Sequence, residues 1–555
     1  MKLFKRGIAL LLVMCALAVP VAAAQSAEAA IVNPYGLYTY DQMCADIAAL
    51  EARYPDLISS AVIGKSVEGR NIPVFTLGKG KREIIICASM HAREYVSTNV
   101  VMYLAEQYCR GYAANSSYDC IPSGYSWARK PLSYRTMLDG VRFVIVPMVN
   151  PDGVTLAQRG WVTDKQLPKL SEMPYTDAPY AYYYGWKANI NGVDLNHNWP
   201  YYWKEDPKVK VPSSANYAGP HAMSEPETVA MNTLMETTPF YMLCSFHTYG
   251  QCIYWIDDTN SKTMQNQFRP LALRFAHGTG YSLMESEPLG SRGGYMVNYA
   301  RAKYGKFAMT VELCPNYSYP YSDENYKHNL AYTIERVHPL FLMMADEVLK
   351  MDPDDVAIDV RVDNKLVLFT DVRPTLEANR TLVPVRSVCE ACGLTVGWDN
   401  ATRTVTVTDG ETRVELKIDS REMTVFPPFV APETEDAPAP VPEETVEPAE
   451  DAGAPDAESE EADPDAPQPD PEAEGDESTE ATDGTEEPDE PEVPETPEAP
   501  EEDPLPDDGR YSVQLDAPAR LINGRTVLPI RAVLEAFGIR VSWDNPNYTV
   551  IVTTK

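Results

Sequence analysis

The stretch "IIICASMHARE" at residues 84–94 joins an apolar run to two side chains that bind metals well. Ile84 to Met90 is nearly continuous in apolar character, as a strand covered on both faces of a sheet requires. The run stops at His91, and Glu94 follows three residues later. A lone histidine at a strand end is more often a structural residue than a ligand, so the rest of the chain must supply partners.

The chain has 555 residues, more than the roughly 250–300 residues of a single core, which predicts several domains. Residues 1–24 are typical of a signal peptide: basic residues precede an apolar stretch, Ile8 to Val19, and then small residues. Residues 25–34 form a short leader. The apolar stretch is shorter than the about 20 residues of a membrane span, so we expect an exported chain without a transmembrane anchor.

The negative charge is concentrated in one segment. Of 81 acidic residues, 33 lie in residues 427–509, which contain no Lys or Arg. The rest of the chain holds 48 acidic and 47 basic residues, so this segment carries nearly all of the net charge of -34. Its Pro- and acid-rich composition predicts disorder. The rest of the chain has no excess of basic residues, so we expect no nucleic-acid partner.

Residues 35–352 alternate helical and strand patterns, which favours an α/β layer fold. Thr39 and Gln42 predict a helix start, as do Ser224 and Glu227 around Pro226. A long amphipathic helix is expected from about residue 328 to residue 350. Apolar strand-like runs occur at 84–90, 141–149, 240–246 and 307–313.

Residues 356–426 and 510–555 contain an internal repeat. "NRTLVPVRSVCEACGLTVGWDN" (379–400) matches "GRTVLPIRAVLEAFGIRVSWDN" (524–545) at a constant offset of 145 residues. Neither copy is large enough for a core of its own. We therefore expect the two copies to pack as one small β-rich domain, interrupted by the acidic segment at 427–509.

Cysteine usage suggests one bridge. An exported protein can form disulfides, and Cys109 with Cys120 is the best candidate pair. Cys87 and Cys244 lie in apolar runs, where buried free thiols are common. The motif Cys389–Cys392 has no second CxxC and is a poor zinc candidate.

The candidate metal ligands lie at strand ends, where open α/β sheets bind ligands. His247 ends the run 240–246, as His91 ends its own. Two histidines and a carboxylate around an open position describe a catalytic zinc site, so we predict that His91, Glu94 and His247 bind one zinc ion. Glu312 lies inside an apolar run, where an unpaired charge is costly. It is the expected general base, with a structural ion pair as the alternative, and Asp194 is expected to orient a liganding imidazole.

Taken together and in this order, the motifs resemble the zinc carboxypeptidases of the carboxypeptidase A type. The resemblance covers about residues 35–350 and rests on "IGKSVEGRNIPV" (63–74), "HARE" (91–94), "NPDG" (150–153), "GVDLNHNW" (192–199), "SFHTYG" (245–250), "GSRGGY" (290–295) and "TVEL" (310–313). It implies a doubly wound fold around a mixed sheet, one zinc ion and peptide hydrolysis. It assigns the three ligands, the catalytic role of Glu312 and the supporting role of Asp194 to the same residues.

The departures from the family concern the substrate. Lys187 stands where the family has an arginine that polarises the carbonyl, and lysine lacks the bidentate fork. Asn196 and His197 stand where the family binds the terminal carboxylate with an Asn-Arg pair, and a neutral imidazole cannot replace that guanidinium. Arg93 completes the expected substrate-binding residues. Leu289 stands where the family has a mobile tyrosine.

A bacterial branch of the family, the γ-D-glutamyl-diamino acid peptidases of cell-wall metabolism, also lacks that arginine. "WKAN" (186–189), "GVDLN" and "GPHAMSEPET" (219–228) resemble this branch. We therefore expect a metallopeptidase that acts on peptidoglycan stem peptides. Met296, near the position that shapes the side-chain pocket, offers no partner for a charged diamino acid. The tyrosine-rich stretch 175–186 is interpreted as a packed insertion rather than a groove.

The C-terminal repeats resemble the copper amine oxidase N-terminal-like domain of exported proteins from Gram-positive bacteria. Copper is not implied, because no histidine follows His338. Trp398 and Trp543 are expected in the core. We expect this domain to associate with the cell wall, and the protein to be secreted, extracellular or wall-associated in a Gram-positive bacterium.

Two other functions stay open. The first is a secreted metallocarboxypeptidase that removes C-terminal residues from general peptides and binds their carboxylate through His197 or another cation. The second is an inactive peptidase fold that serves as a surface binding module. The intact set His91, Glu94, His247 and Glu312 argues against the second, because a decayed site usually loses one of these residues.

Overall fold

The computed structural model describes residues 29–121, 130–163, 165–174, 182–203, 209–257, 259–284, 293–315, 324–352, 358–377, 380–428, 509–544 and 548–554. The expected signal peptide, most of the tyrosine-rich stretch, Leu289 and nearly all of the acidic segment lie outside these residues. Within them, no helix combines the length and the apolar character that crossing a membrane demands.

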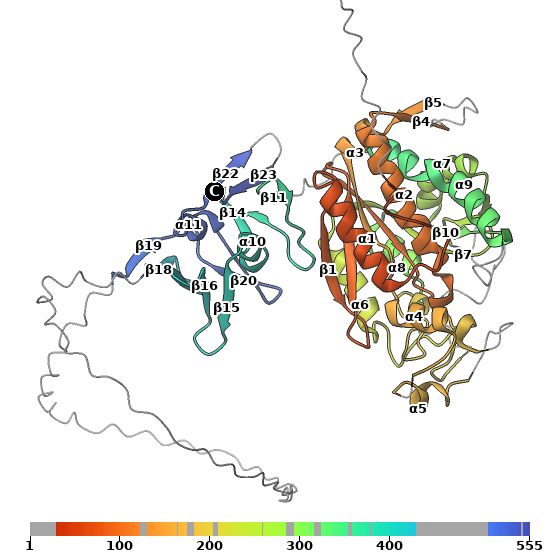
Figure 1. Cartoon of the computed structure of the whole chain (residues 1–555), viewed down its shortest axis with the longest axis horizontal. Coiled ribbons are helices and arrows are strands. Elements are labelled where there is room, and N and C mark those ends of the chain that lie inside the picture. The colour runs from red at the N-terminus through yellow and green to blue at the C-terminus, as the bar shows by residue number, and fades with distance from the viewer. Residues whose placement is uncertain are drawn as a thin grey trace, which may run out of the picture. The chain divides into compact units, whose positions relative to one another are not determined.

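A mixed eight-stranded sheet forms the centre of the N-terminal region (Figure 1). Its order is β1 (Ser60–Lys65), β2 (Asn71–Leu77), β6 (Val141–Val146), β3 (Arg82–Ala88), β7 (Phe240–Thr248), β10 (Phe307–Leu313), β8 (Cys252–Tyr254) and β9 (Ser282–Met284). The middle strands β6, β3, β7 and β10 are parallel, whereas β1, β2 and β8 join the sheet through antiparallel pairs. The four predicted strands are these four middle strands, and the predicted mixed sheet is confirmed.

Helices cover both faces of the sheet, which makes the fold doubly wound as predicted. Alternate strand residues divide between two apolar clusters: Ile84 and Ile86 face one layer, and Ile85 faces the other. The first layer contains α1 (Tyr40–Arg53), α2 (Val96–Ala113), α7 (Lys262–Thr279) and α9 (Glu324–Val348), and the second contains α6 (Pro226–Thr237) and α8 (Met296–Tyr304). The remaining elements of the region are β4 (Ser117–Cys120), β5 (Lys130–Ser133), α3 (Tyr134–Gly140), α4 (Pro151–Arg159) and α5 (Leu167–Leu170).

The helix starts follow the predicted caps with one exception. The Thr39 side chain accepts a hydrogen bond from Gln42 N at the start of α1, as its capping pattern predicts. Helix α6 has Pro226 in its first turn, but its N-cap is Glu225. Ser224 instead donates a hydrogen bond to the Glu225 carboxylate at 2.7 Å, so its predicted capping role is wrong by one residue.

The two copies of the repeat fold alike and share one core. The first copy contains β14 (Arg380–Pro384), α10 (Val385–Ala391), β15 (Thr395–Asp399) and β16 (Thr404–Thr408), and the second contains β21 (Arg525–Leu528), α11 (Ile530–Glu535), β22 (Arg540–Asp544) and β23 (Thr549–Thr553). The strands β14 and β21 pair antiparallel, and residues of both copies form a single buried cluster. The predicted packing of the copies against each other is confirmed.

Two ion pairs between the copies join residues that are equivalent at the offset of the repeat. Arg380 pairs with Asp516 at 2.9 Å, and Arg525, the equivalent of Arg380, pairs with Asp371, the equivalent of Asp516. Each copy therefore gives the other one arginine and one aspartate. This exchange is what an approximate twofold relation between the copies produces.

The other strands of the C-terminal region extend this shared core. They are β11 (Asp359–Val362), β12 (Lys365–Leu366), β13 (Thr375–Glu377), β17 (Arg413–Lys417), β18 (Glu422–Phe426), β19 (Tyr511–Gln514) and β20 (Arg520–Ile522). β15 and β19 are the two edges of a five-stranded sheet in the order β15-β16-β17-β18-β19.

Two expectations about single residues are wrong. Cys109 in α2 and Cys120 in β4 are both buried free thiols, so the expected bridge is not formed. Cys87 and Cys244 are buried free thiols as predicted. Trp398 is 40% exposed rather than in the core, whereas Trp543 at the equivalent position packs partly buried against the shared core.

A substitution in the second copy should destabilise both copies, because they share one core. Leu528 in β21 is fully buried opposite Val383 of the first copy. We expect Leu528→Ala to lower the free energy of unfolding of this domain by about 2–5 kcal/mol. Hydrogen exchange of the amides in β16 and β22 would report both copies together. Leu376→Ala, at a 53% exposed leucine of β13, is the matched control. Faster exchange in β22 with β16 unchanged would show that the copies unfold independently.

Candidate metal centre

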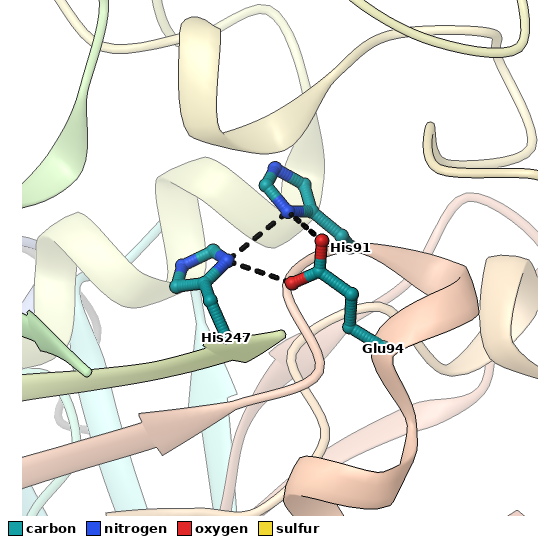
Figure 2. Close-up of side chains that lie close together, drawn as sticks. All are labelled: His91, Glu94 and His247. Carbon is teal, nitrogen blue, oxygen red and sulfur yellow. Dashed lines mark hydrogen bonds and ion pairs between the residues drawn. The ribbon is translucent and has the colours of Figure 1, made fainter. Parts of the chain in front are cut away.

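Three buried side chains converge at the carboxyl ends of β3 and β7 (Figure 2). His91 Nδ1 lies 2.8 Å from Glu94 Oε1, and His247 Nδ1 lies 2.9 Å from Glu94 Oε2. The two Nδ1 atoms are 3.0 Å apart, and the rings meet edge to face with centroids 4.6 Å apart. Among the described residues this is the group whose geometry suits a metal ion. The sequence-based prediction placed the same three residues together.

The local sequence explains how two of the ligands are brought together. β3 ends at Ala88, and a one-turn 3-10 helix, η1 (Ala92–Glu94), follows with His91 as its N-cap. This turn folds Glu94 back beside His91, which is what a spacing of three residues achieves on a helical turn. The third ligand comes from β7, the direct neighbour of β3 in the sheet.

Asp194 orients His91 from behind, as predicted. His91 Nε2 donates a hydrogen bond to Asp194 Oδ1 at 3.0 Å, which leaves the Nδ1 lone pair directed toward Glu94 and His247. The same carboxylate accepts hydrogen bonds from the backbone N–H groups of Asn196 and Asn216. Lys187 Nζ lies 3.1 Å from the other oxygen, Oδ2.

The charges around Asp194 keep it ionised. Burial alone raises the pKa of this carboxyl, but Lys187 and His91 outweigh burial and hold the pKa of Asp194 well below its usual range. Burial lowers the pKa of His91, but Glu94 and Asp194 raise it by more. The pKa of His91 therefore lies above its usual value. Burial lowers the pKa of His247, and its hydrogen bond to Glu94 only partly opposes that change. His247 therefore loses its proton at a lower pH than His91.

The loop "WKANINGVDLN" places Lys187 and Asp194 together. The Trp186 indole is fully buried and donates to the backbone oxygen of Asn189, and the Asn189 side chain accepts from the backbone N–H of Val193. These bonds close the loop on itself. The backbone oxygen of Lys187 accepts a hydrogen bond from Ala92 N, which fastens the loop to the turn that carries His91.

Asn196 and His197 are both buried and already engaged. The Asn196 side-chain oxygen accepts from Met296 N, and His197 Nδ1 lies 3.2 Å from the backbone oxygen of Gly293. Gly294 has a φ of +75°, and a Cβ there would lie 1.9 Å from the His197 carbonyl oxygen. A glycine is therefore needed at position 294 for the chain to approach His197 this closely.

The other predicted substrate residues are buried too. Arg93 donates a hydrogen bond to the backbone oxygen of Gly185 at 3.3 Å. The Met296 side chain is fully buried in the apolar cluster beneath α8, and its position near a side-chain pocket stays a prediction.

Asn150, in the motif "NPDG", joins two segments of the site, which the sequence did not reveal. Its amide donates hydrogen bonds to the backbone oxygens of Met90 and Ala188. It therefore joins the residue before His91 to the residue after Lys187. Asp152 of the same motif accepts from Ser66 and Arg70, which anchors the segment 63–74. The motif therefore connects the segments around the site through hydrogen bonds.

Ser245 is a second residue that the sequence analysis missed. Its hydroxyl lies 3.0 Å from His247 Nε2, and the Cys87 thiol donates to that hydroxyl at 3.4 Å. Ser245 supports His247 as Asp194 supports His91. The signal was present in the sequence, because residues two apart on a strand face the same side.

Glu312 lies beside His247 on the neighbouring strand. The parallel pairing of β10 and β7 sets Glu312 directly opposite His247, so both side chains project from the same face. It also pairs with Cys252 of β8 across the antiparallel side. The glutamate thus lies next to a candidate ligand without being one of the converging donors.

The donor set fits zinc. Zinc accepts imidazole nitrogen and carboxylate oxygen, and catalytic sites use three such protein ligands with one open position. Here both rings present Nδ1 to the same point, and each ring's Nε2 has an acceptor that fixes the tautomer. The site needs no rearrangement of rings to receive one small cation.

The chain belongs to the zinc carboxypeptidase family. Residues 43–337 match that family, and residues 361–444 and 508–554 match the copper amine oxidase N-terminal domain. Both resemblances seen in the sequence are confirmed.

Three curated relatives illustrate the range of the family. The chain is 33% identical over 245 residues to γ-D-glutamyl-L-diamino acid endopeptidase 1 of Lysinibacillus sphaericus, covering 43% of this chain and 58% of that protein. It is 28% identical to carboxypeptidase B of Astacus astacus, covering 50% and 86%. It is 28% identical to the inactive metallocarboxypeptidase ECM14 of Arthroderma gypseum, covering 35% and 30%. The chain thus spans little more than half the length of the endopeptidase.

Removing the support of His247 should weaken metal binding. We expect Ser245→Ala to lower the affinity for zinc about 10–100-fold, because the His247 ring then loses the partner that fixes its tautomer. Competition with a chromophoric chelator would measure this affinity without any substrate. Ser282→Ala, at an exposed serine of β9, is the control and should bind zinc like the parent. Equal affinities for all three proteins would show that Ser245 does not support the site.

Proposed function

We propose that this chain is an exported zinc metallopeptidase that hydrolyses a peptide bond in the stem peptides of peptidoglycan. The proposal combines membership in the zinc carboxypeptidase family with the way the site departs from the family pattern at Asn196 and His197. The predicted signal peptide and the C-terminal domain favour a wall-associated location outside the cell.

The contacts that already occupy Asn196 and His197 are the observation on which the proposed class of substrate rests. A classical carboxypeptidase needs a bidentate cation for the free carboxylate of its substrate. Here that position is a buried imidazole whose Nδ1 faces a backbone oxygen, beside an asparagine whose oxygen is occupied by Met296 N. Neither side chain offers a paired charge to a terminal carboxylate. A peptide cleaved away from its C-terminal carboxylate suits this site better.

The residues of the chain have separate roles in the proposed reaction. His91, Glu94 and His247 would hold zinc, which polarises the scissile carbonyl and lowers the pKa of a water when bound. Glu312 accepts the proton of the attacking water at its carboxylate and passes it to the leaving amine. Lys187, paired with Asp194, supplies positive charge next to the reacting carbonyl.

The activity for which one relative is named supports this substrate, and the activity of another supports a second candidate function. The Lysinibacillus protein is named as a γ-D-glutamyl-L-diamino acid endopeptidase. The Astacus protein is named as a carboxypeptidase and is covered over 86% of its length. The second candidate function is therefore removal of C-terminal residues from general peptides, with His197 or another cation binding the carboxylate.

A comparison of two substrates would separate these functions. The full chain would be incubated with a stem peptide that contains a γ-D-glutamyl-diaminopimelate bond and with an ordinary peptide that has a free C-terminus. Products would be identified by mass. We expect cleavage at the γ-D-glutamyl bond and little loss from the ordinary peptide. Stepwise loss of C-terminal residues from the ordinary peptide would instead establish the carboxypeptidase.

The catalytic role of Glu312 is tested with the same assay. We expect Glu312→Gln to lower kcat about 10²–10⁴-fold, because the amide cannot accept the proton of the water, while zinc binding stays unchanged. Glu236→Gln, at an exposed glutamate paired with Lys303, is the control and should retain full activity. Full activity in Glu312→Gln would contradict its role as the general base.

A zinc measurement addresses the inactive-fold hypothesis, which the inactive relative keeps open. We expect one zinc ion per chain, loss of activity on chelation, and recovery when zinc is restored. Stoichiometric zinc without cleavage of either peptide would favour a surface binding module.

A further inference from the structure

The C-terminal domain contains a pocket of about 330 Å³ at the junction of the two copies. Its walls come from α10 and β15 of the first copy and from the turn between β20 and β21 of the second, elements that lie side by side in Figure 1. Side chains that line it include Trp398, Arg386, Glu390, Leu521 and Arg525. This volume is at the lower end of the range of about 300–1,000 Å³ for ligand pockets.

The indole of Trp398 is 40% exposed in this pocket, whereas its counterpart Trp543 is partly buried. Trp543, at the equivalent position, packs against the shared core and meets the Tyr548 ring edge to face at 6.2 Å. The residue equivalent to Tyr548 is Arg403, whose guanidinium pairs with Asp419 at 3.4 Å. Trp398 therefore has no aromatic neighbour at the position where Tyr548 contacts Trp543.

Gly397, which precedes Trp398 on β15, also differs between the copies. The second copy has Ser542 at this position. A Cβ on Gly397 would meet Thr406 Cβ at 3.7 Å, an ordinary contact, so the fold accommodates a side chain there. The strand thus does not require a glycine here, and because neighbouring strand residues face opposite sides, a side chain at this position would leave Trp398 uncovered.

Two charged groups of the pocket also differ between the copies. In the second copy Arg531 and Glu535 pair with each other at 3.9 Å. Their equivalents Arg386 and Glu390 are exposed on α10, and within the described part of the chain neither side chain forms a hydrogen bond or an ion pair. Each therefore remains available to a ligand. The Arg525–Asp371 ion pair borders the same pocket from the other copy.

We propose that this pocket binds one sugar unit of a polysaccharide. A pyranose ring has an apolar C–H face and a polar rim, which matches one open indole face surrounded by a free guanidinium and a free carboxylate. The mixed charge of the rim disfavours nucleic acid, which requires an excess of basic groups. Sugar hydroxyls and acetamido groups pair with Arg386 and Glu390 while the ring stacks on Trp398. That the polysaccharide is the glycan of the cell wall rests on the proposed function.

Co-sedimentation with insoluble polysaccharides tests this proposal. The full chain carrying Glu312→Gln would be mixed with chitin, with cellulose and with purified peptidoglycan sacculi. The first two polymers contain no peptide, so binding to them is independent of the peptidase site. We expect binding to chitin and to sacculi, whose sugars are N-acetylated, and weaker binding to cellulose. Binding to cellulose alone would support a sugar-binding site but would reject the wall glycan as its ligand.

Variants of the pocket assign the binding. We expect Trp398→Ala to raise the dissociation constant for chitin about tenfold or more, Arg386→Ala to raise it less, and Trp398→Phe to retain most of the affinity. Tyr511→Ala is the matched control, because Tyr511 is 50% exposed on β19, the opposite edge of the same sheet. With a soluble N-acetylglucosamine oligomer, the tryptophan fluorescence of the parent should change and that of Trp398→Phe should not.

Three results would overturn the proposal. They are absence of binding to every peptide-free polysaccharide, unchanged chitin binding in both Trp398→Ala and Arg386→Ala, and equal losses in Tyr511→Ala. Binding to sacculi alone that persists in Trp398→Ala would place the contact in the peptidase site instead. Cleavage of the stem peptide by the protein with Glu312 intact is measured separately, so failure of the sugar site and failure of the proposed function are distinguishable.

Discussion

The carboxylate of Asp194 is the constraint on which the site depends. It is fully buried, yet it stays ionised because a lysine, a histidine and two backbone N–H groups surround it. A buried charge is tolerated only with such partners. In satisfying Asp194, the chain fixes the tautomer of His91 and holds the ammonium of Lys187 beside the metal ligands. One electrostatic requirement thus sets the positions of a ligand and of the neighbouring cation together.

Much of the fold and the metal centre could be predicted because each leaves a local signal. The four middle strands are continuous apolar runs, and His91 and His247 end two of them. The spacing of His91 and Glu94 within one turn was also readable. The sequence does not display contacts between distant segments. The hydrogen bonds of Asn150 and the bond that occupies the Asn196 side-chain oxygen are such contacts. They could therefore be recognised only in the folded chain.

The error at Trp398 has a specific physical origin. Sequence similarity between the copies suggested the same environment for both tryptophans, because Trp398 and Trp543 occupy equivalent positions. Exposure depends on neighbours, and the neighbour at Tyr548 became Arg403 in the other copy. The residues of both copies form one core, while the surface residues around the two tryptophans differ.

The pairing of β18 with β19 determines what the acidic insertion can do mechanically. Val425 lies opposite Tyr511 in that pair, so both ends of residues 427–509 are fixed at adjacent strands of one sheet. Lengthening such a closed loop costs little, only about 0.6 kcal/mol per doubling. It also leaves the reach of the protein unchanged, because the insertion does not lie between two domains. A single proteolytic cut in this loop would produce two chains that the shared core still holds together.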